Sequence, residues 1–91
     1  MSAVIKIPTS LRGLTGGSSI VEVKEGQLGE VITNLTDIYP ELGERLLDEN
    51  GNLRRFVNVF VADDDIRFLE GLETDVSSGQ VVTILPAVAG G

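Results

Sequence analysis

The stretch that decides the fold is residues 20–38, IVEVKEGQLGEVITNLTDI. Apolar and polar side chains alternate over Ser19–Lys24, which overlaps the start of this stretch. This alternation predicts a β-strand with one buried face. The apolar residues then recur at steps of three and four, which predicts an amphipathic helix over about Gln27–Tyr39. The helix stripe comprises Leu28, Val31, Ile32, Leu35 and Ile38. Its N-cap is weak by residue type, and Pro40 is expected to stop it.

The segment before this stretch predicts a partner for the strand. Met1–Ile7 also alternates, with Ala3, Ile5 and Ile7 on one face, and Pro8 ends it. Three glycines within Arg12–Ser19 indicate a hairpin loop between the two strands. The chain therefore begins with two strands and continues into a helix.

The segment after the helix supplies the rest of the sheet. Phe56–Ala62 alternates cleanly, with Val57, Val59 and Val61 on one face, which predicts another strand. Turns and short elements are expected around it. They are a short helical turn at Leu42–Leu47, turns at Asn50–Asn52, Asp63–Asp65 and Ser77–Gly79, a short returning strand at Ile66–Phe68, and a final strand at Val81–Leu85 closed by Pro86.

This order of elements favours one α+β domain of the β-grasp (ubiquitin-like) type. The helix covers one face of a mixed sheet, and the final strand lies beside the first. With 91 residues the chain has room for one compact domain. We expect this domain to span residues 1–86 and residues 87–91 to form a flexible C-terminal tail.

The composition excludes several kinds of function. The chain has no Cys and no His, so it lacks a thiol nucleophile, the commonest general base and the commonest metal ligand. Its net charge of −7 disfavours nucleic acid and suits either a partner with a basic patch or plain solubility. It shows no membrane-length apolar run and no signal segment, so we expect a cytoplasmic location.

The C-terminal end, Ala87-Val88-Ala89-Gly90-Gly91, carries the chemistry. Two final glycines can occur in a frayed terminus, but here the tail that contains them follows directly from a core strand and Pro86. Five extended residues reach about 17 Å, and a Gly-Gly end fits a narrow channel because it has no β-carbon. The carboxylate of Gly91 is ionised at neutral pH and is a poor electrophile until it is activated, for example as an acyl-adenylate. Because the chain has no phosphate-binding loop of the G-x-x-x-x-G-K type, another protein must activate it.

The whole chain resembles the ThiS/MoaD family of sulfur carriers, and most closely its CysO-like branch in cysteine biosynthesis. Three segments carry the likeness, namely Arg55–Asn58, Asp65–Phe68 and Val82–Gly91. Small subunits of molybdopterin synthase usually have a second Pro where this chain has Ala87. Carriers of the thiamin pathway are usually shorter and lack the pattern around Pro86.

The resemblance implies that an E1-like enzyme adenylates Gly91 with ATP and that sulfur then forms a C-terminal thiocarboxylate. It implies a cysteine synthase as acceptor, a metal-dependent peptidase that releases cysteine, and a chain that is a protein cosubstrate rather than an enzyme, with no cofactor of its own. The alternatives are a small subunit of molybdopterin synthase, a shared donor for other sulfur-containing metabolites and a ubiquitin-like modifier. The same activated Gly91 would serve all of them.

A docking surface is expected beside the tail. If the valines of Phe56–Ala62 face the helix, Phe56 and Phe60 point outward, and Leu85 joins them from the final strand by the same alternation. An exposed apolar patch next to a reactive tail suits partner docking. The alternative is that the register is inverted and these side chains belong to the core.

The remaining charged groups favour structural roles. Asp63–Asp65 could hold a hard cation, but consecutive residues in a tight turn rarely converge, so a solvated turn is expected. The pairs Glu22 and Glu25, or Glu41 and Glu44, indicate exposed charge rather than catalysis. Arg54-Arg55 either flanks a strand or contacts an acidic partner.

Overall fold

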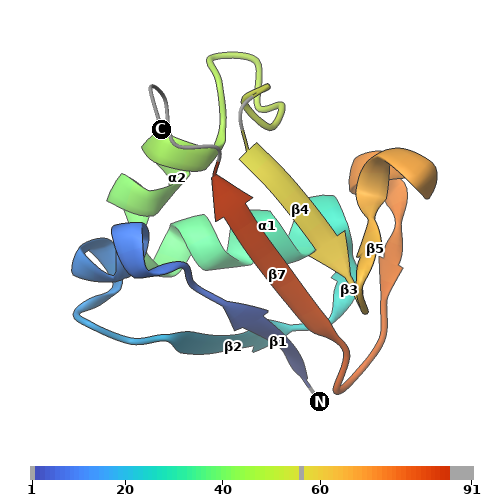
Figure 1. Ribbon diagram of the computed structural model, residues 1–91, viewed down its shortest axis with the longest axis horizontal. Coiled ribbons are helices and arrows are strands. Elements are labelled where there is room, and N and C mark those ends of the chain that lie inside the picture. The colour runs from blue at the N-terminus through green and yellow to red at the C-terminus, as the bar shows by residue number, and fades with distance from the viewer. Residues whose placement is uncertain (1, 56, 87–91) are drawn as a thin grey trace.

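A five-stranded mixed sheet forms the centre of the computed structural model, which describes residues 2–55 and 57–86 (Figure 1). The strands lie in the order β2-β1-β7-β4-β5. Their bounds are Ser2–Lys6 (β1), Ile20–Lys24 (β2), Val57–Val61 (β4), Asp64–Asp65 (β5) and Val81–Pro86 (β7). Strand β7 runs parallel to β1, whereas the β1–β2, β4–β7 and β4–β5 pairs are antiparallel. The last strand thus lies beside the first, and the predicted β-grasp fold is confirmed.

Two α-helices, three short 3₁₀ helices and a second small sheet complete the domain. Helix α1 lies across the sheet, and α2 follows it directly (Figure 1). The bounds are Leu28–Ile38 (α1), Pro40–Leu46 (α2), Thr9–Thr15 (η1), Ile66–Phe68 (η2) and Gly71–Glu73 (η3), with Gly26–Gln27 (β3) pairing Asp75–Val76 (β6).

Helix α1 matches the predicted amphipathic stripe at four of its five positions. Leu28, Val31, Ile32 and Leu35 are buried, whereas Ile38 at the last turn is 53% exposed. The N-cap residue Gln27 makes no side-chain cap, as the sequence indicates. The Leu28 N–H instead donates to the carbonyl of Thr74 at 2.8 Å, so a distant segment satisfies one of the amides that a helix start leaves unpaired.

Pro40 starts a second helix as well as stopping the first. It occupies the first turn of α2, where a missing N–H costs no intrahelical bond. The predicted helical turn over Leu42–Leu47 is confirmed in this position, with Leu42 and Leu46 buried. The two helices therefore contribute one continuous apolar layer to the core.

The predicted register of the central strands is correct. Val57, Val59 and Val61 of β4 are buried, and so are Val82 and Ile84 of β7. These side chains face the helices together with those of Ala3, Ile5, Val21 and Val23 from the first hairpin. Alternation along β4 and β7 therefore leaves the other face of the sheet uncovered by the core.

The segment after β4 differs from the prediction. The short strand expected at Ile66–Phe68 is wrong, because these residues form the 3₁₀ helix η2, and the strand is β5 at Asp64–Asp65. The Asp65 carboxylate accepts from the Arg67 N–H at 2.8 Å and caps η2, which starts the helical turn at once. The hairpin turn falls on Ala62 and Asp63, whose φ angles of 50° and 76° suit a tight two-residue β-hairpin.

The loop expected at Arg12–Ser19 is also more ordered than predicted. Its first part belongs to the 3₁₀ helix η1, which ends at Gly16 with a φ of 65°. The buried Thr15 hydroxyl lies within hydrogen-bonding distance of two carbonyls, at 3.1 Å from Arg12 O and 2.8 Å from Ser18 O. These local bonds stabilise the return to β2 and were not visible in the apolar pattern.

The close approach of α1 and α2 generates a stability prediction. A β-carbon at Gly43 would lie 2.8 Å from Thr36 Cγ2 and 2.9 Å from Thr36 Cβ, so Gly43→Ala must push the helices apart. Crowding of this kind costs about 1–3 kcal/mol, and the better helix propensity of Ala returns up to about 1 kcal/mol. We expect a net loss of about 1 kcal/mol in urea unfolding.

The matched control is Gly13→Ala. Nothing lies within 4 Å of a β-carbon at Gly13, so its free energy of unfolding should change by less than about 0.5 kcal/mol. Equal stability of the two variants would contradict the tight contact between the helices.

Candidate functional site

The root of the tail is held inside the sheet. Strand β7 pairs with β1 along its first half and with β4 along its whole length, where Pro86 lies opposite Val57. Residues 87–91, and with them the predicted tail Ala87–Gly90 and the sulfur attachment site Gly91, lie outside the described residues. The chain reaches that segment from a strand that is paired with β4 up to Pro86, while β1 pairs only with Val81–Thr83.

The position of Pro86 follows from the hydrogen-bond pattern. The Ala62 N–H donates to the carbonyl of Val81 at 3.0 Å, so the directly opposed pairs Asn58–Leu85 and Phe60–Thr83 exchange ladder bonds. At Pro86 the backbone nitrogen therefore points away from β4, on the side where β1 has already ended. A proline fits here because no ladder bond is lost.

The open face of the sheet carries the predicted docking residues that the structure describes. Leu85 is 48% exposed, and Phe60 is half-buried beside Thr83 on the same face. Phe56 lies outside the described residues. The outward orientation predicted for Phe60 and Leu85 is thus confirmed, although Phe60 exposes less of its ring than a free surface side chain.

Strand β1 adds side chains to this face that sequence reasoning missed. Val4 lies opposite Val81, and Lys6 opposite Thr83, in the parallel ladder of β1 and β7. Both alternate with the buried residues of β1, so they point to the open face. Alternation gives their orientation, but only the register of the ladder shows that they lie beside β7.

A polar cluster lies on the β4–β5 side of the open face. The Arg67 guanidinium donates through Nη2 to Asn58 Oδ1 and to Asp65 Oδ2, at 2.8 Å each. The hydrogen bonds that the Arg67 side chain donates to Asp65, and then the one from the Arg67 backbone N–H, lower the pKa of the Asp65 carboxyl below its ordinary value. Because the Arg67 side chain is 68% exposed, the cluster lies at the surface and orients η2 against β4.

Two apolar side chains of the following segment project into solvent. Phe68 is 87% exposed and Leu69 is 41% exposed. Sequence reasoning placed Phe68 in a strand and gave it no surface role. Its exposure results from the 3₁₀ turn, which buries Ile66 and directs the next residues outward.

The acidic residues form no site for a metal ion in the part of the chain described. No group of three or more Asp or Glu side chains converges there. Asp65 pairs with Arg67, and the Glu22 carboxylate accepts a hydrogen bond from the Ser2 hydroxyl at 2.8 Å. These two contacts give Asp65 and Glu22 structural partners, whereas the sequence indicated a solvated turn and exposed charge at these positions.

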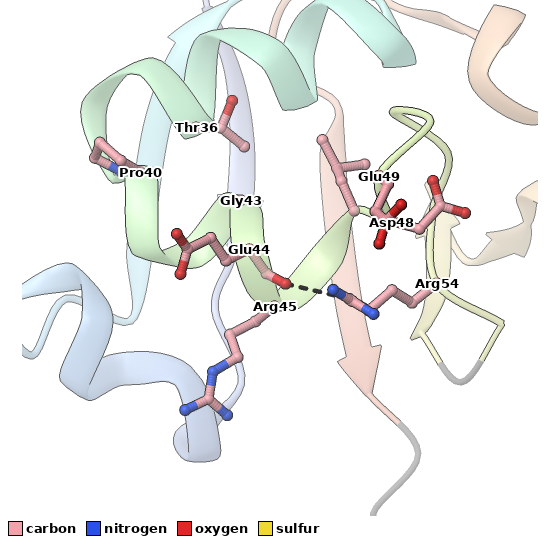
Figure 2. Close-up of a pocket in the computed structure, with 9 residues that line it drawn as sticks. Thr36, Pro40, Gly43, Glu44, Arg45, Asp48, Glu49 and Arg54 are labelled. Atoms are coloured by element: carbon pink, nitrogen blue, oxygen red, sulfur yellow. Dashed lines mark hydrogen bonds between the residues drawn. The ribbon is translucent and has the colours of Figure 1, made fainter.

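A shallow depression of 740 Å³ lies between α2 and the chain that leads into β4 (Figure 2). Glu44, Arg45, Asp48, Glu49 and Arg54 line it together with smaller residues. Figure 2 shows the Arg54 side chain reaching the carbonyl of Glu44, to which its Nε donates at 3.1 Å. Mixed charges on an open surface provide no catalytic geometry, so this depression is structural.

In the ranges 2–55 and 57–86, none of the helices has the length and apolar character needed to cross a membrane.

The comparisons with known proteins agree with this architecture. The ThiS family matches residues 5–91. The sulfur carrier protein CysO of Mycobacterium tuberculosis is 48% identical to this chain over 93 residues. The alignment covers 100% of each of the two chains. A chain of the Amycolatopsis orientalis BexX/CysO complex is 45% identical with a TM-score of 0.89, covering 98% of this chain and 99% of that one. Small archaeal modifier protein 3 of Haloferax volcanii is 33% identical over 67 residues, 74% of this chain and 72% of its own.

The chain therefore belongs to the ThiS family of sulfur carriers. It is a sulfur carrier protein similar over its full length to CysO. Carriers of this family are cosubstrates on which partner enzymes act, so the chain is not itself an enzyme.

Proposed function

We propose that the chain carries sulfur as a thiocarboxylate on Gly91 and donates it to a cysteine synthase. The observation that carries this proposal is the full-length similarity to CysO in a chain that ends in Gly90-Gly91. A Gly-Gly end beyond a core strand can enter a partner's active site, because neither residue has a β-carbon. The steps below are those that the resemblance to the ThiS/MoaD carriers implies.

The activation step uses ATP on an E1-like partner. An oxygen of the Gly91 carboxylate attacks the α-phosphorus of ATP, pyrophosphate leaves, and an acyl-adenylate forms. Sulfide then attacks the acyl carbon and displaces AMP, which leaves the thiocarboxylate. The chain's own part is to present the carboxylate on a segment of five residues, which would reach about 17 Å beyond Pro86 if fully extended.

The open face of the sheet is our candidate for partner docking. Phe60 and Leu85 line it next to the strand that leads into the tail, and Phe56 would extend it by alternation. An apolar surface next to the reactive end lets one partner hold the domain and the tail together. The tail residues Ala87, Val88, Ala89 and Gly90 would then line the partner's channel.

The acceptor is proposed to be a cysteine synthase, with a metal-dependent peptidase that later releases cysteine. Ala87 in place of a second proline frees one φ angle, and a mobile tail suits a carrier that visits several enzymes in turn. A modifier role is the second candidate, because small archaeal modifier protein 3 shares 33% identity over 74% of this chain. The Amycolatopsis complex of CysO with BexX supports a shared donor that docks on further partners.

Removal of Gly90 and Gly91 should abolish sulfur loading without altering the fold. Both residues lie beyond β7, so the thermal midpoint should stay within about 2 °C of the full-length protein. Loading is measured by intact-protein mass spectrometry after incubation with the activating enzyme, ATP and sulfide. One residue added after Gly91 should block loading as well, whereas the same residue added before Met1 should not. Normal loading of the truncated chain would contradict the proposal.

Leu85→Asp and Phe60→Asp should weaken binding to the activating enzyme. Loss of a central interface anchor commonly costs upward of about 2 kcal/mol, or roughly thirtyfold in Kd by calorimetry. Ile20→Asp is the matched control, since Ile20 is 53% exposed but lies on β2 at the far edge of the sheet. Val59→Asp, at a position 1% exposed, should unfold the domain. Binding of the Leu85 and Phe60 variants as tight as that of the unchanged protein would exclude this part of the open face as the docking surface.

Thiocarboxylated protein should form a covalent carrier–cysteine adduct at Gly91 when mixed with cysteine synthase and an activated serine. Mass spectrometry of the C-terminal peptide detects this product. If molybdopterin forms with the large subunit of molybdopterin synthase and no cysteine adduct appears, the proposed cysteine synthase acceptor is wrong. The chain would still be a sulfur carrier. Lysine isopeptides in cell extract without either transfer would favour the modifier role.

A further inference from the structure

A small notch lies along the edge of β4 that faces β5, separate from the open face of the sheet. Strand β5 pairs only with Phe60 and Val61, so Val57–Val59 has no strand neighbour on that edge within the described residues. A cavity of 170 Å³ lies in this gap. Its lining comprises the apolar residues Leu53, Val57, Val59 and Ile66 with Asn58 and Asp65, and the three arginines Arg54, Arg55 and Arg67.

The backbone of β4 presents a donor to this notch. Because Asn58 and Phe60 exchange ladder bonds with β7, the peptide N–H of Val59 between them points to the opposite side of the strand. The Val57 N–H on the same edge already donates to the Arg54 carbonyl at 2.9 Å. Val59 is only 1% exposed, so this N–H lies at the base of the notch, and an incoming segment would contact the side chains around it.

The charge around the notch is opposite to that of the whole chain. Three of the seven Lys and Arg residues line it, in a protein with a net charge of −7. Asp65 is the one carboxylate in the lining, and it is occupied by Arg67, which also binds Asn58. Arg54 donates through Nε to the Glu44 carbonyl, which orients its guanidinium, while Arg55 is exposed. The guanidinium fork binds carboxylates in a bidentate manner, so acidic groups suit this rim.

We propose that the notch binds an extended acidic segment of a partner protein, which inserts one apolar side chain between the arginines. The apolar floor and the small volume suit a single side chain, and the arginines suit the carboxylates on either side of it. A second copy of this chain fits less well, because two bodies of charge −7 repel each other. The contact is distinct from the docking face, since it uses the edge of β4 rather than its outward side chains.

The place of the notch indicates which partners would use it. Val57 at its floor lies opposite Pro86, so a bound segment sits beside the root of the tail. An enzyme that takes the tail into its active site could contact the notch at the same time. The idea that the partner is an enzyme acting on the tail rests on the proposed function, whereas the binding of an acidic segment at the notch does not.

The test is an NMR titration of the ¹⁵N-labelled protein with the peptide acetyl-Glu-Asp-Leu-Asp-Glu-amide. We expect amide shifts concentrated at Asn58, Val59, Ile66 and Arg67. The same peptide with Gln and Asn in place of the acids should bind about tenfold more weakly, because the charge-assisted bonds to the arginines are lost. Shifts elsewhere, no shifts at millimolar peptide, or equal binding of the uncharged peptide would overturn the proposal.

Replacing single basic residues by Glu shows whether the peptide binds at the notch or is attracted only by the net charge of the protein. Arg55→Glu changes an exposed side chain and should weaken binding of the acidic peptide about tenfold, and the double variant Arg55→Glu with Arg67→Glu should weaken it further. Lys24→Glu makes the same charge change on exposed β2 and should alter the affinity less than about twofold. An equal loss in the Lys24 variant would show that only net charge matters.

Sulfur loading of the same variants distinguishes this inference from the proposed function. A wild-type protein that binds the peptide at the notch but is never loaded would refute sulfur carriage and keep the acidic site. A protein that is loaded but does not bind the peptide would refute the acidic site and keep sulfur carriage.

Discussion

The parallel pairing of β1 with β7 is the contact on which the rest of the structure depends. It joins the two ends of the domain, with Ile5 opposite Val82, and both side chains are fully buried. A parallel ladder needs a long connection between its strands, and here the helices and β4 supply it. Because β7 lies between β1 and β4, the backbone that leads into the tail starts from the middle of the sheet rather than from a frayed edge.

The two faces of the sheet then take different roles. One face binds α1 and α2 through the side chains of Val59, Val82 and Ile84, which are almost completely buried. The other exposes Leu85 and part of Phe60 around a strand that continues toward Gly91. On our proposal, a protein without Cys, His or a phosphate loop takes part in acyl chemistry in this way, because it offers a carboxylate and a surface while partner enzymes supply the reacting groups.

The edge of the sheet shows how a short strand creates a local feature. The Asp65 carboxylate caps η2, and β5 ends after two residues, so within the described residues three of the five residues of β4, Val57–Val59, have no strand on that edge. The same carboxylate orients Arg67 toward Asn58, which brings a third arginine to the Arg54-Arg55 segment. One aspartate thus lies at the gap in the sheet and orients part of the charge around it.

The sequence by itself determined the order of the elements, the amphipathic stripe of α1 and the inward side of β4 and β7, because each depends on a periodicity within one segment. It also indicated the family through the Gly90-Gly91 end and the segments that resemble it. The tertiary structure revealed that Ile66–Phe68 curls into a 3₁₀ helix, because a local cap by Asp65 outweighs the apolar pattern on which the strand prediction rested. It alone placed Val4 and Lys6 beside β7, and Arg67 beside Arg55, because pairing register and long-range contacts join residues that no local spacing relates.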